Sequence, residues 1–271
     1  MFLRKVALLV PALALPAGLA KAAPKNWEIG LQPAASPVMA QIEDFHRLLL
    51  VIIVAICIFV AVLLGWVMLR YNRRANPVPS KVHHNTLLEV AWTIVPVVIL
   101  VVIAIPSFRL LYFEGAIPKA DVTVEAIGRQ WYWTYVYPRD GGVQFDSNML
   151  PDAVAAQRGE PRLLGVDNPL VVPVNKVVEV DTTGSDVIHS WAVPAFGVKM
   201  DAIPGRINRT WFKATRTGTF YGQCSELCGA NHAFMPIEVK VVSQREYDAW
   251  LAQAKKKFVA TDDGATRLAS N

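Results

Sequence analysis

Two long apolar segments constrain the fold more than any other feature of this chain. They occupy residues 48–69, between Arg47 and Arg70, and residues 90–111. A helix of about 20 apolar residues crosses the hydrocarbon core of a bilayer, so each segment predicts a membrane span. The whole chain is 53% hydrophobic with a mean hydropathy of +0.32, which is too apolar for an ordinary soluble domain.

The charges beside these segments predict an orientation. The link between the spans carries several basic residues and no acid from Arg70 to Lys81, and such loops face the cytoplasm. Both outer ends of the hairpin then lie outside. Residues 1–22 are expected to be a secretory signal, with a basic start, a short apolar stretch and an A-x-A site at 20–22. A third span is the alternative, but the stretch is short and holds two prolines.

From residue 117 onward the pattern predicts an all-β domain. Short alternating or apolar runs are separated by Gly, Pro, Asn and Asp, which is typical of a β-sandwich or barrel. The expected strands cover residues 122–126, 131–137, 170–174, 177–180, 210–214 and 237–241. A helix is expected over 244–258 and a flexible tail over 259–271. The chain therefore divides into a signal (1–22), an N-terminal segment with the hairpin (23–116), a β-domain (117–258) and the tail.

One loop of the β-domain carries a dense set of soft metal ligands. Residues 224–235 read CSELCGANHAFM and supply Cys224, Cys228, His232 and Met235, while His189 is the one other histidine of this domain. Thiolate and thioether sulfur select copper, and imidazole suits it. A mononuclear blue-copper site uses one Cys, whereas two thiolates can bridge two metals. The set predicts a binuclear copper electron-transfer centre.

Other interpretations of this loop remain open. Cys224 and Cys228 could form a disulfide in an oxidising compartment, but His232 and Met235 would then have no role. Structural zinc is a further alternative, although it prefers Cys and His ligands. Glu226 lies between the two Cys, so its backbone carbonyl can turn toward the metals while its carboxylate points to a partner, another cation or solvent.

Two positions outside the loop carry functional hypotheses. Alternation places Trp131, Trp133 and Tyr135 on one face of a strand and Tyr132 on the other. A core covers one face, so one ring is expected to be exposed or at an interface. Glu89 stands at the cytoplasmic start of the second span, where it is either an interfacial residue or part of a proton path.

Five motifs resemble the cytochrome c oxidase subunit II family. They are EVAWTI at 89–94, QWYW at 130–133, DVIHSW at 186–191, DAIPGR at 201–206 and GQCSELCG at 222–229. The resemblance covers nearly the whole chain after the signal. It implies a two-helix transmembrane hairpin followed by a Greek-key cupredoxin domain that carries the binuclear CuA centre. The implied ligands are His189, Cys224, Cys228, His232, Met235 and the Glu226 carbonyl.

The resemblance also implies partners. Cytochrome c would deliver electrons at Trp131, and the copper pair would pass them to heme a in subunit I, where oxygen is reduced to water and protons are translocated. The Glu226 carboxylate would bind a magnesium ion shared with subunit I, and Glu89 would open a proton path into it. Subunit III and membrane lipid are further expected neighbours. The location would be a bacterial-type inner membrane with the β-domain in the periplasm.

The chain departs from the family pattern at the expected docking surface. Val136 and Gly142 stand where acids are often found in the family. Asp140, Asp146 and Asp186 remain as candidate docking acids, so a shallow dependence of association on salt is expected. The formal charge of +5 comes largely from basic residues beside the apolar segments, and no nucleic-acid partner is expected.

Three other functions were compared with this one. A quinol oxidase subunit II has the same architecture but lacks the copper ligands. A membrane-anchored copper-delivery protein uses Cys-x3-Cys, but with one span and a thioredoxin-like αβ pattern. Nitrous oxide reductase carries CuA but is soluble and much larger.

Overall fold

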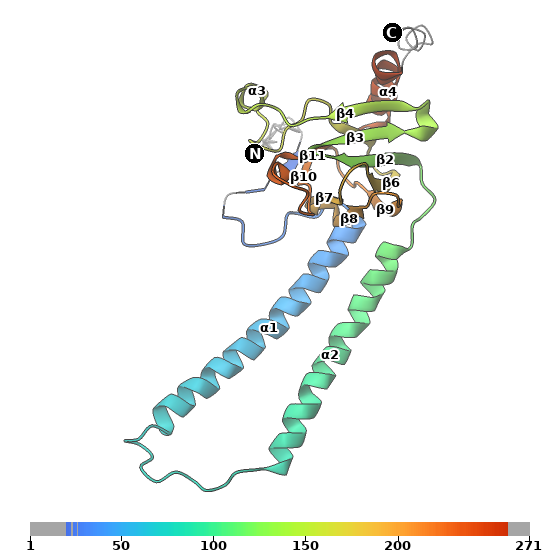
Figure 1. Ribbon diagram of the computed structural model, residues 1–271. Coiled ribbons are helices and arrows are strands. Elements are labelled where there is room, and N and C mark those ends of the chain that lie inside the picture. Colours follow the sequence, from blue (N-terminus) through green and yellow to red (C-terminus); the bar gives the residue numbers. More distant parts are fainter. Residues whose placement is uncertain (1–19, 23, 26, 260–271) are drawn as a thin grey trace, which may run out of the picture.

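The computed structural model describes residues 20–22, 24–25 and 27–259 (Figure 1). A long helical hairpin leaves one end of a β-domain, as Figure 1 shows. Most of the predicted signal, residues 1–19, lies outside the described residues, and so does the predicted tail from residue 260. The end of the predicted signal forms a short strand, β1 (Ala20–Ala22), beside β10.

The two apolar segments form the helices α1 (Pro37–Arg70) and α2 (Thr86–Gly115). Both are long and apolar enough to cross a membrane. They begin before the apolar runs because capping residues fix their starts: the side chains of Ser36 and Asn85 accept hydrogen bonds from backbone N–H groups of the first turn. Most apolar side chains of both helices are exposed, so lipid or other subunits must cover them.

The β-domain contains a five-stranded, a four-stranded and a two-stranded sheet. The first has the order β4-β3-β2-β6-β9, the second β1-β10-β11-β5, and the third pairs β7 with β8. The first is built from β4 (Val143–Ser147), β3 (Tyr132–Tyr137), β2 (Val122–Arg129), β6 (Val177–Gly184) and β9 (Asn208–Lys213). The other strands are β10 (Gly218–Gln223), β11 (Pro236–Val242), β5 (Leu170–Pro173), β7 (His189–Val193) and β8 (Val198–Ala202).

The short helical elements are α3 (Asp152–Gln157), α4 (Gln244–Phe258), η1 (Pro138–Asp140), η2 (Pro194–Phe196) and η3 (His232–Phe234). The expected helix over 244–258 is therefore confirmed as α4. Ser243 and Glu246 form a capping box at its start.

Large aromatic side chains fill the core between the sheets. Trp133, Tyr135 and Tyr137 point inward from β3, and each is fully buried. The Tyr137 hydroxyl donates to the Val171 carbonyl at 2.8 Å and accepts from the Val171 N–H at 3.1 Å. This hydroxyl therefore ties the five-stranded sheet to β5 of the other sheet, while its ring contributes roughly 2–3 kcal/mol of burial.

Hydrogen bonds attach the β-domain to the outer ends of the two helices. The Ser36 hydroxyl donates to the Phe196 carbonyl at 2.6 Å, and the Trp211 indole donates to the Glu114 carbonyl at 3.0 Å. Gly197 has a φ of +69°, and a Cβ there would lie 3.1 Å from the Met39 backbone. The start of α1 and the end of α2 thus hold the β-domain at a fixed height above the spans.

Candidate metal centre

Two neighbouring strands bring the predicted ligands together. His189 is the first residue of β7, and the loop with Cys224 and Cys228 follows β10. The two strands approach closely at Gly222, where a Cβ would lie only 1.9 Å from the Ala192 carbonyl oxygen. Glycine at this position is therefore required for β10 to carry its loop beside His189.

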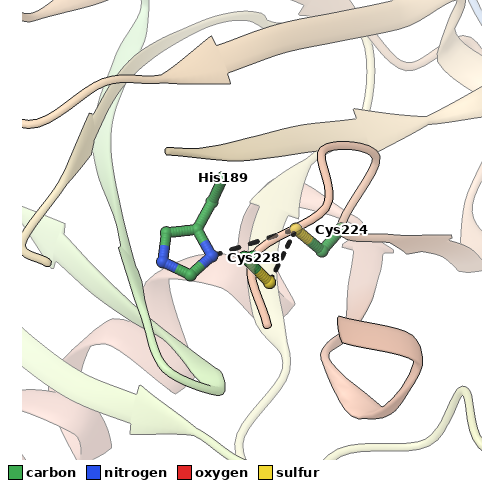
Figure 2. A group of neighbouring side chains, drawn as sticks. All are labelled: His189, Cys224 and Cys228. Carbon is green, nitrogen blue, oxygen red and sulfur yellow. Dashed lines mark hydrogen bonds between the residues drawn. The ribbon is translucent and has the colours of Figure 1, made fainter. Parts of the chain in front are cut away.

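The ligand atoms form a row of imidazole, thiol, thiol and imidazole. His189 Nδ1 lies 3.9 Å from Cys224 Sγ, the two sulfur atoms are 3.9 Å apart, and Cys228 Sγ lies 3.5 Å from His232 Nδ1. Figure 2 shows the contacts running from the His189 ring to the Cys224 sulfur and from there to the Cys228 sulfur. Both cysteines are free, because a disulfide requires sulfur atoms about 2.05 Å apart.

The remaining residues of the predicted set, Met235 and Glu226, contact Cys224 through their backbone carbonyls. Met235 is 1% exposed, and its carbonyl accepts the Cys224 N–H at 3.0 Å. Cys224 Sγ lies 3.4 Å from the Glu226 carbonyl oxygen, so that carbonyl faces the site. Soft sulfur donors and imidazoles in one buried cluster fit copper, and magnesium, which prefers oxygen donors, does not fit them.

Burial and hydrogen bonds shift the pKa values of the two thiols in opposite directions. Burial raises the pKa of Cys228, and the neighbouring Cys224 reinforces the rise, to about 12. Burial acts in the same direction at Cys224, but hydrogen bonds with the His189 imidazole and the Glu226 backbone outweigh it and lower its pKa to about 6. The metal-free site therefore favours one thiolate beside one thiol, and a bound cation would displace the remaining proton.

The same family emerges from comparison with known proteins. Residues 122–242 match the family model described as cytochrome c oxidase subunit II, periplasmic domain, and residues 24–110 match the transmembrane domain of that subunit. A probable cytochrome c oxidase subunit 2 of Rickettsia bellii is 49% identical over 248 residues, which cover 92% of this chain and 91% of that protein. The chain belongs to the cytochrome c oxidase subunit II family.

Two further relatives agree with this assignment. The cytochrome c oxidase subunit 2 of Cereibacter sphaeroides is 50% identical over 249 residues, covering 86% of this chain and 82% of that protein. The crystal structure of the periplasmic domain of subunit II of cytochrome oxidase from Bradyrhizobium japonicum is 62% identical. It covers 53% of this chain and 99% of that chain, with a TM-score of 0.50.

Family membership turns several expectations into conclusions. The chain is a membrane-anchored subunit of a heme-copper oxidase complex, with two spans and a periplasmic β-domain. His189, Cys224, Cys228 and Met235 form a copper-binding site typical of CuA. The copper-delivery and nitrous oxide reductase alternatives are thereby excluded.

Residues that are not ligands orient those that are. The Asp186 carboxylate lies 2.8 Å from His189 Nε2, which leaves Nδ1 facing Cys224. Burial opposes the charged form of Asp186, but the hydrogen bonds from His189 and nearby backbone N–H groups lower its pKa. Gly128 leaves space for the imidazole, because a Cβ there would lie 2.6 Å from the His189 ring.

Trp131 contacts the site directly. Its indole N–H donates to the Cys228 carbonyl at 3.2 Å, and its ring is partly buried. The side-chain amide of Gln130 donates to the same carbonyl at 2.8 Å. Sequence reasoning did not select Gln130, and its place immediately before Trp131 was the one available signal.

The candidate docking acids occupy three different environments. Asp186 lies beside His189, whereas Asp146 accepts a hydrogen bond from the Thr134 hydroxyl at 2.6 Å. Asp140 accepts from the Tyr247 hydroxyl at 3.0 Å. It follows β3, so roughly 20 Å of strand separates it from Trp131. The docking role of all three stays a prediction.

The remaining predicted positions are Glu226 and Glu89. The Glu226 side chain is exposed, as a residue that binds a cation shared with another subunit requires. Glu89 lies in the first turn of α2, and its carboxylate accepts the Asn85 N–H at 3.3 Å. That bond gives Glu89 a capping role, and its proton-path role stays a prediction.

Proposed function

We propose that this chain holds two copper ions between His189, Cys224, Cys228, His232, Met235 and the Glu226 carbonyl. The observation that carries the proposal is the row of four donor atoms, with the two sulfur atoms in the middle and one imidazole at each end. When bound, the copper pair supplies a carrier that accepts and releases one electron at a time.

The residues of the chain would shape this carrier in three ways. The two thiolates lie where each could be shared by both metals, and each imidazole lies where it would complete one of them. The buried side chains of Cys224, Cys228 and Met235 exclude water from the donors, which tunes the potential of a bound metal. β7 holds His189, and β10 and β11 anchor the two ends of the segment that carries the other donors, so little movement is expected to accompany a change of charge.

The proposal extends to the electron path. Cytochrome c would dock over Trp131, whose indole already touches the backbone of a ligand residue. The electron would then leave for heme a in subunit I, with subunit III and lipid as further neighbours of the spans. The exposed Glu226 carboxylate would share a magnesium ion with subunit I, and Glu89 would admit protons to it. We also propose that the chain is divided into a signal, a transmembrane hairpin, a cupredoxin domain and a tail, as the sequence predicts.

Metal analysis of the purified chain tests the copper pair. Two copper ions per chain are expected, with a purple mixed-valence spectrum. Cys224→Ser should leave at most one copper and a mononuclear spectrum, whereas Cys57→Ser, on the exposed surface of α1, should keep both. One copper per wild-type chain, or a Cys224–Cys228 disulfide in the loaded protein, would show that the proposal is wrong.

The magnesium site is tested separately in the assembled oxidase. Manganese can replace magnesium and reports its surroundings by electron paramagnetic resonance. Glu226→Gln should remove or alter the manganese signal while the copper content stays the same, because the backbone carbonyl is retained. An unchanged manganese signal would show that the exposed Glu226 carboxylate contacts solvent and does not bind the metal.

A further inference from the structure

A network of hydrogen bonds joins Trp131 to the ligand residues through two side chains that are not ligands. Asp186 lies before β7, and Gln130 lies in the turn between β2 and β3. We infer that Asp186 and Gln130 are positioning residues that hold the Trp131 indole against the Cys228 backbone and thereby set the rate of electron entry. The inference rests on the proposed electron entry at Trp131.

The Asp186 carboxylate uses both of its oxygen atoms within the protein. Oδ1 lies 2.8 Å from His189 Nε2, and Oδ2 accepts the backbone N–H of Gln130 at 2.7 Å. One carboxylate therefore connects a ligand imidazole to the residue before Trp131. Its side chain is 33% exposed. An acid that served only to attract a cationic partner would need neither of these bonds.

Gln130 and Trp131 complete the network on the other side. Both donate to the Cys228 carbonyl, at 2.8 Å and 3.2 Å. The next residue, Gly229, has a φ of +119°, and a Cβ there would lie 3.1 Å from both Gln130 Nε2 and the Trp131 ring. The absence of a side chain at Gly229 thus permits both donors to approach. Electron tunnelling decays less steeply across a hydrogen bond than across a gap of equal width, so this contact favours transfer.

Positioning and docking give different results when the two residues are replaced. Gln130 is uncharged, so its removal leaves the long-range attraction of cytochrome c intact. Asp186→Asn removes the charge but keeps an oxygen that accepts the His189 N–H. Asp186→Ala removes both. A docking role predicts equal effects of the two Asp186 variants on association, and a positioning role predicts a larger effect of alanine on the rate after binding.

The first measurement is the rate of electron transfer within the bound complex of cytochrome c and the assembled oxidase. Gln130→Ala and Asp186→Ala should slow it about tenfold to a hundredfold, the usual range for residues that support metal ligands. Asp186→Asn should fall between alanine and wild type. Gln144→Ala, at an exposed glutamine of β4, should match wild type. Copper content and the midpoint of thermal unfolding show whether each variant has folded.

The second measurement uses the metal-free full chain and does not depend on activity. The indole N–H of Trp131 should exchange slowly with solvent in wild type and in Gln144→Ala, and faster in Gln130→Ala. Equal exchange in Gln130→Ala and wild type, with equal transfer rates, would overturn the inference. If Trp131→Ala transfers electrons within the bound complex at the wild-type rate, the entry role of Trp131 is overturned. If Trp131→Ala slows this transfer while the Gln130 and Asp186 variants keep the wild-type rate, only the positioning roles are overturned.

Discussion

At the scale of single residues, two glycines determine how closely the backbone approaches the ligands. Gly222 lies against a backbone carbonyl that cannot rotate away, whereas Gly128 faces the imidazole of His189. A side chain at Gly222 would therefore disturb the packing of β10 on β7, and one at Gly128 would displace a ligand. A substitution at Gly222 should therefore affect mainly folding, and one at Gly128 should affect mainly metal binding.

Gly128→Ala should weaken copper binding more than it weakens the fold. The new methyl group would lie 2.6 Å from the His189 ring, and overpacking of this kind costs about 1–3 kcal/mol. Copper titration followed by thermal unfolding of the metal-free chain measures both effects. Gly30→Ala, where a Cβ would meet nothing within 4 Å, is the control. If Gly128→Ala binds copper with wild-type affinity, the His189 imidazole can move without weakening copper binding.

Met235→Leu should keep the copper pair and change its reduction potential. A weak thioether ligand tunes potential more than it holds the metal, and leucine preserves the buried volume at a site that is 1% exposed. A redox titration of the copper spectrum measures the shift. An unchanged potential would return Met235 to the role of core residue.

Residue type and spacing were enough to select the ligand set, but not its supports. The structure places His189, Cys224, Cys228 and His232 in one row, as the spacing of soft donors predicted. The inward bonds of Asp186 and the contact of Gln130 with Cys228 depend on how distant loops meet. Since the alternation rule orients side chains within one strand only, it could not reveal contacts between loops.

At the scale of elements, alternation of burial explains only part of the strand prediction, because β5 was expected although it is buried at every position, whereas β4 alternates and was not expected. β2 and β6 alternate over much of their length and were expected, whereas β7 is buried at every position and β10 at all but the last. A strand covered on both faces has no period of two. β7 and β10 were not expected as strands, and they carry His189 and the Cys loop, so two of the elements that position the site were missed.

Glu89 allows a test of function against capping at the start of α2. Its carboxylate accepts the Asn85 N–H, and glutamine keeps that acceptor while removing the titratable group. If Glu89 admits protons, Glu89→Gln and Glu89→Ala should both slow turnover of the assembled oxidase to a similar extent, with unchanged copper spectra. Wild-type turnover in Glu89→Gln, together with weaker assembly of Glu89→Ala, would leave Glu89 as a capping residue.

At the scale of the whole molecule, the fold fixes the metal centre relative to the membrane and ties each of the three candidate docking acids into the protein. Bonds to α1 and α2 hold the β-domain. The candidate docking acids Asp140, Asp146 and Asp186 each bond within the protein. Hydrogen bonds leave the charge of these carboxylates intact, so weak long-range attraction of a cationic cytochrome c is expected from their small number, since Val136 and Gly142 are uncharged.

The association rate of cytochrome c should consequently fall only gently as salt is added. Charges on exposed surfaces are screened over about 8–10 Å at physiological ionic strength, so a steep slope requires several ionised acids near Trp131. Trp131→Ala should leave this slope unchanged while slowing transfer within the complex, because the indole acts after binding. Asp146→Asn should lower the slope slightly without changing the copper spectrum. Stopped-flow rates at increasing ionic strength measure each quantity. If the association rate of the wild-type oxidase falls steeply with salt, the docking acids lie on another subunit or on residues of this chain outside the three candidates. If the slope is shallow and Trp131→Ala slows electron transfer within the complex, contact at the Trp131 ring, rather than long-range charge, governs electron entry.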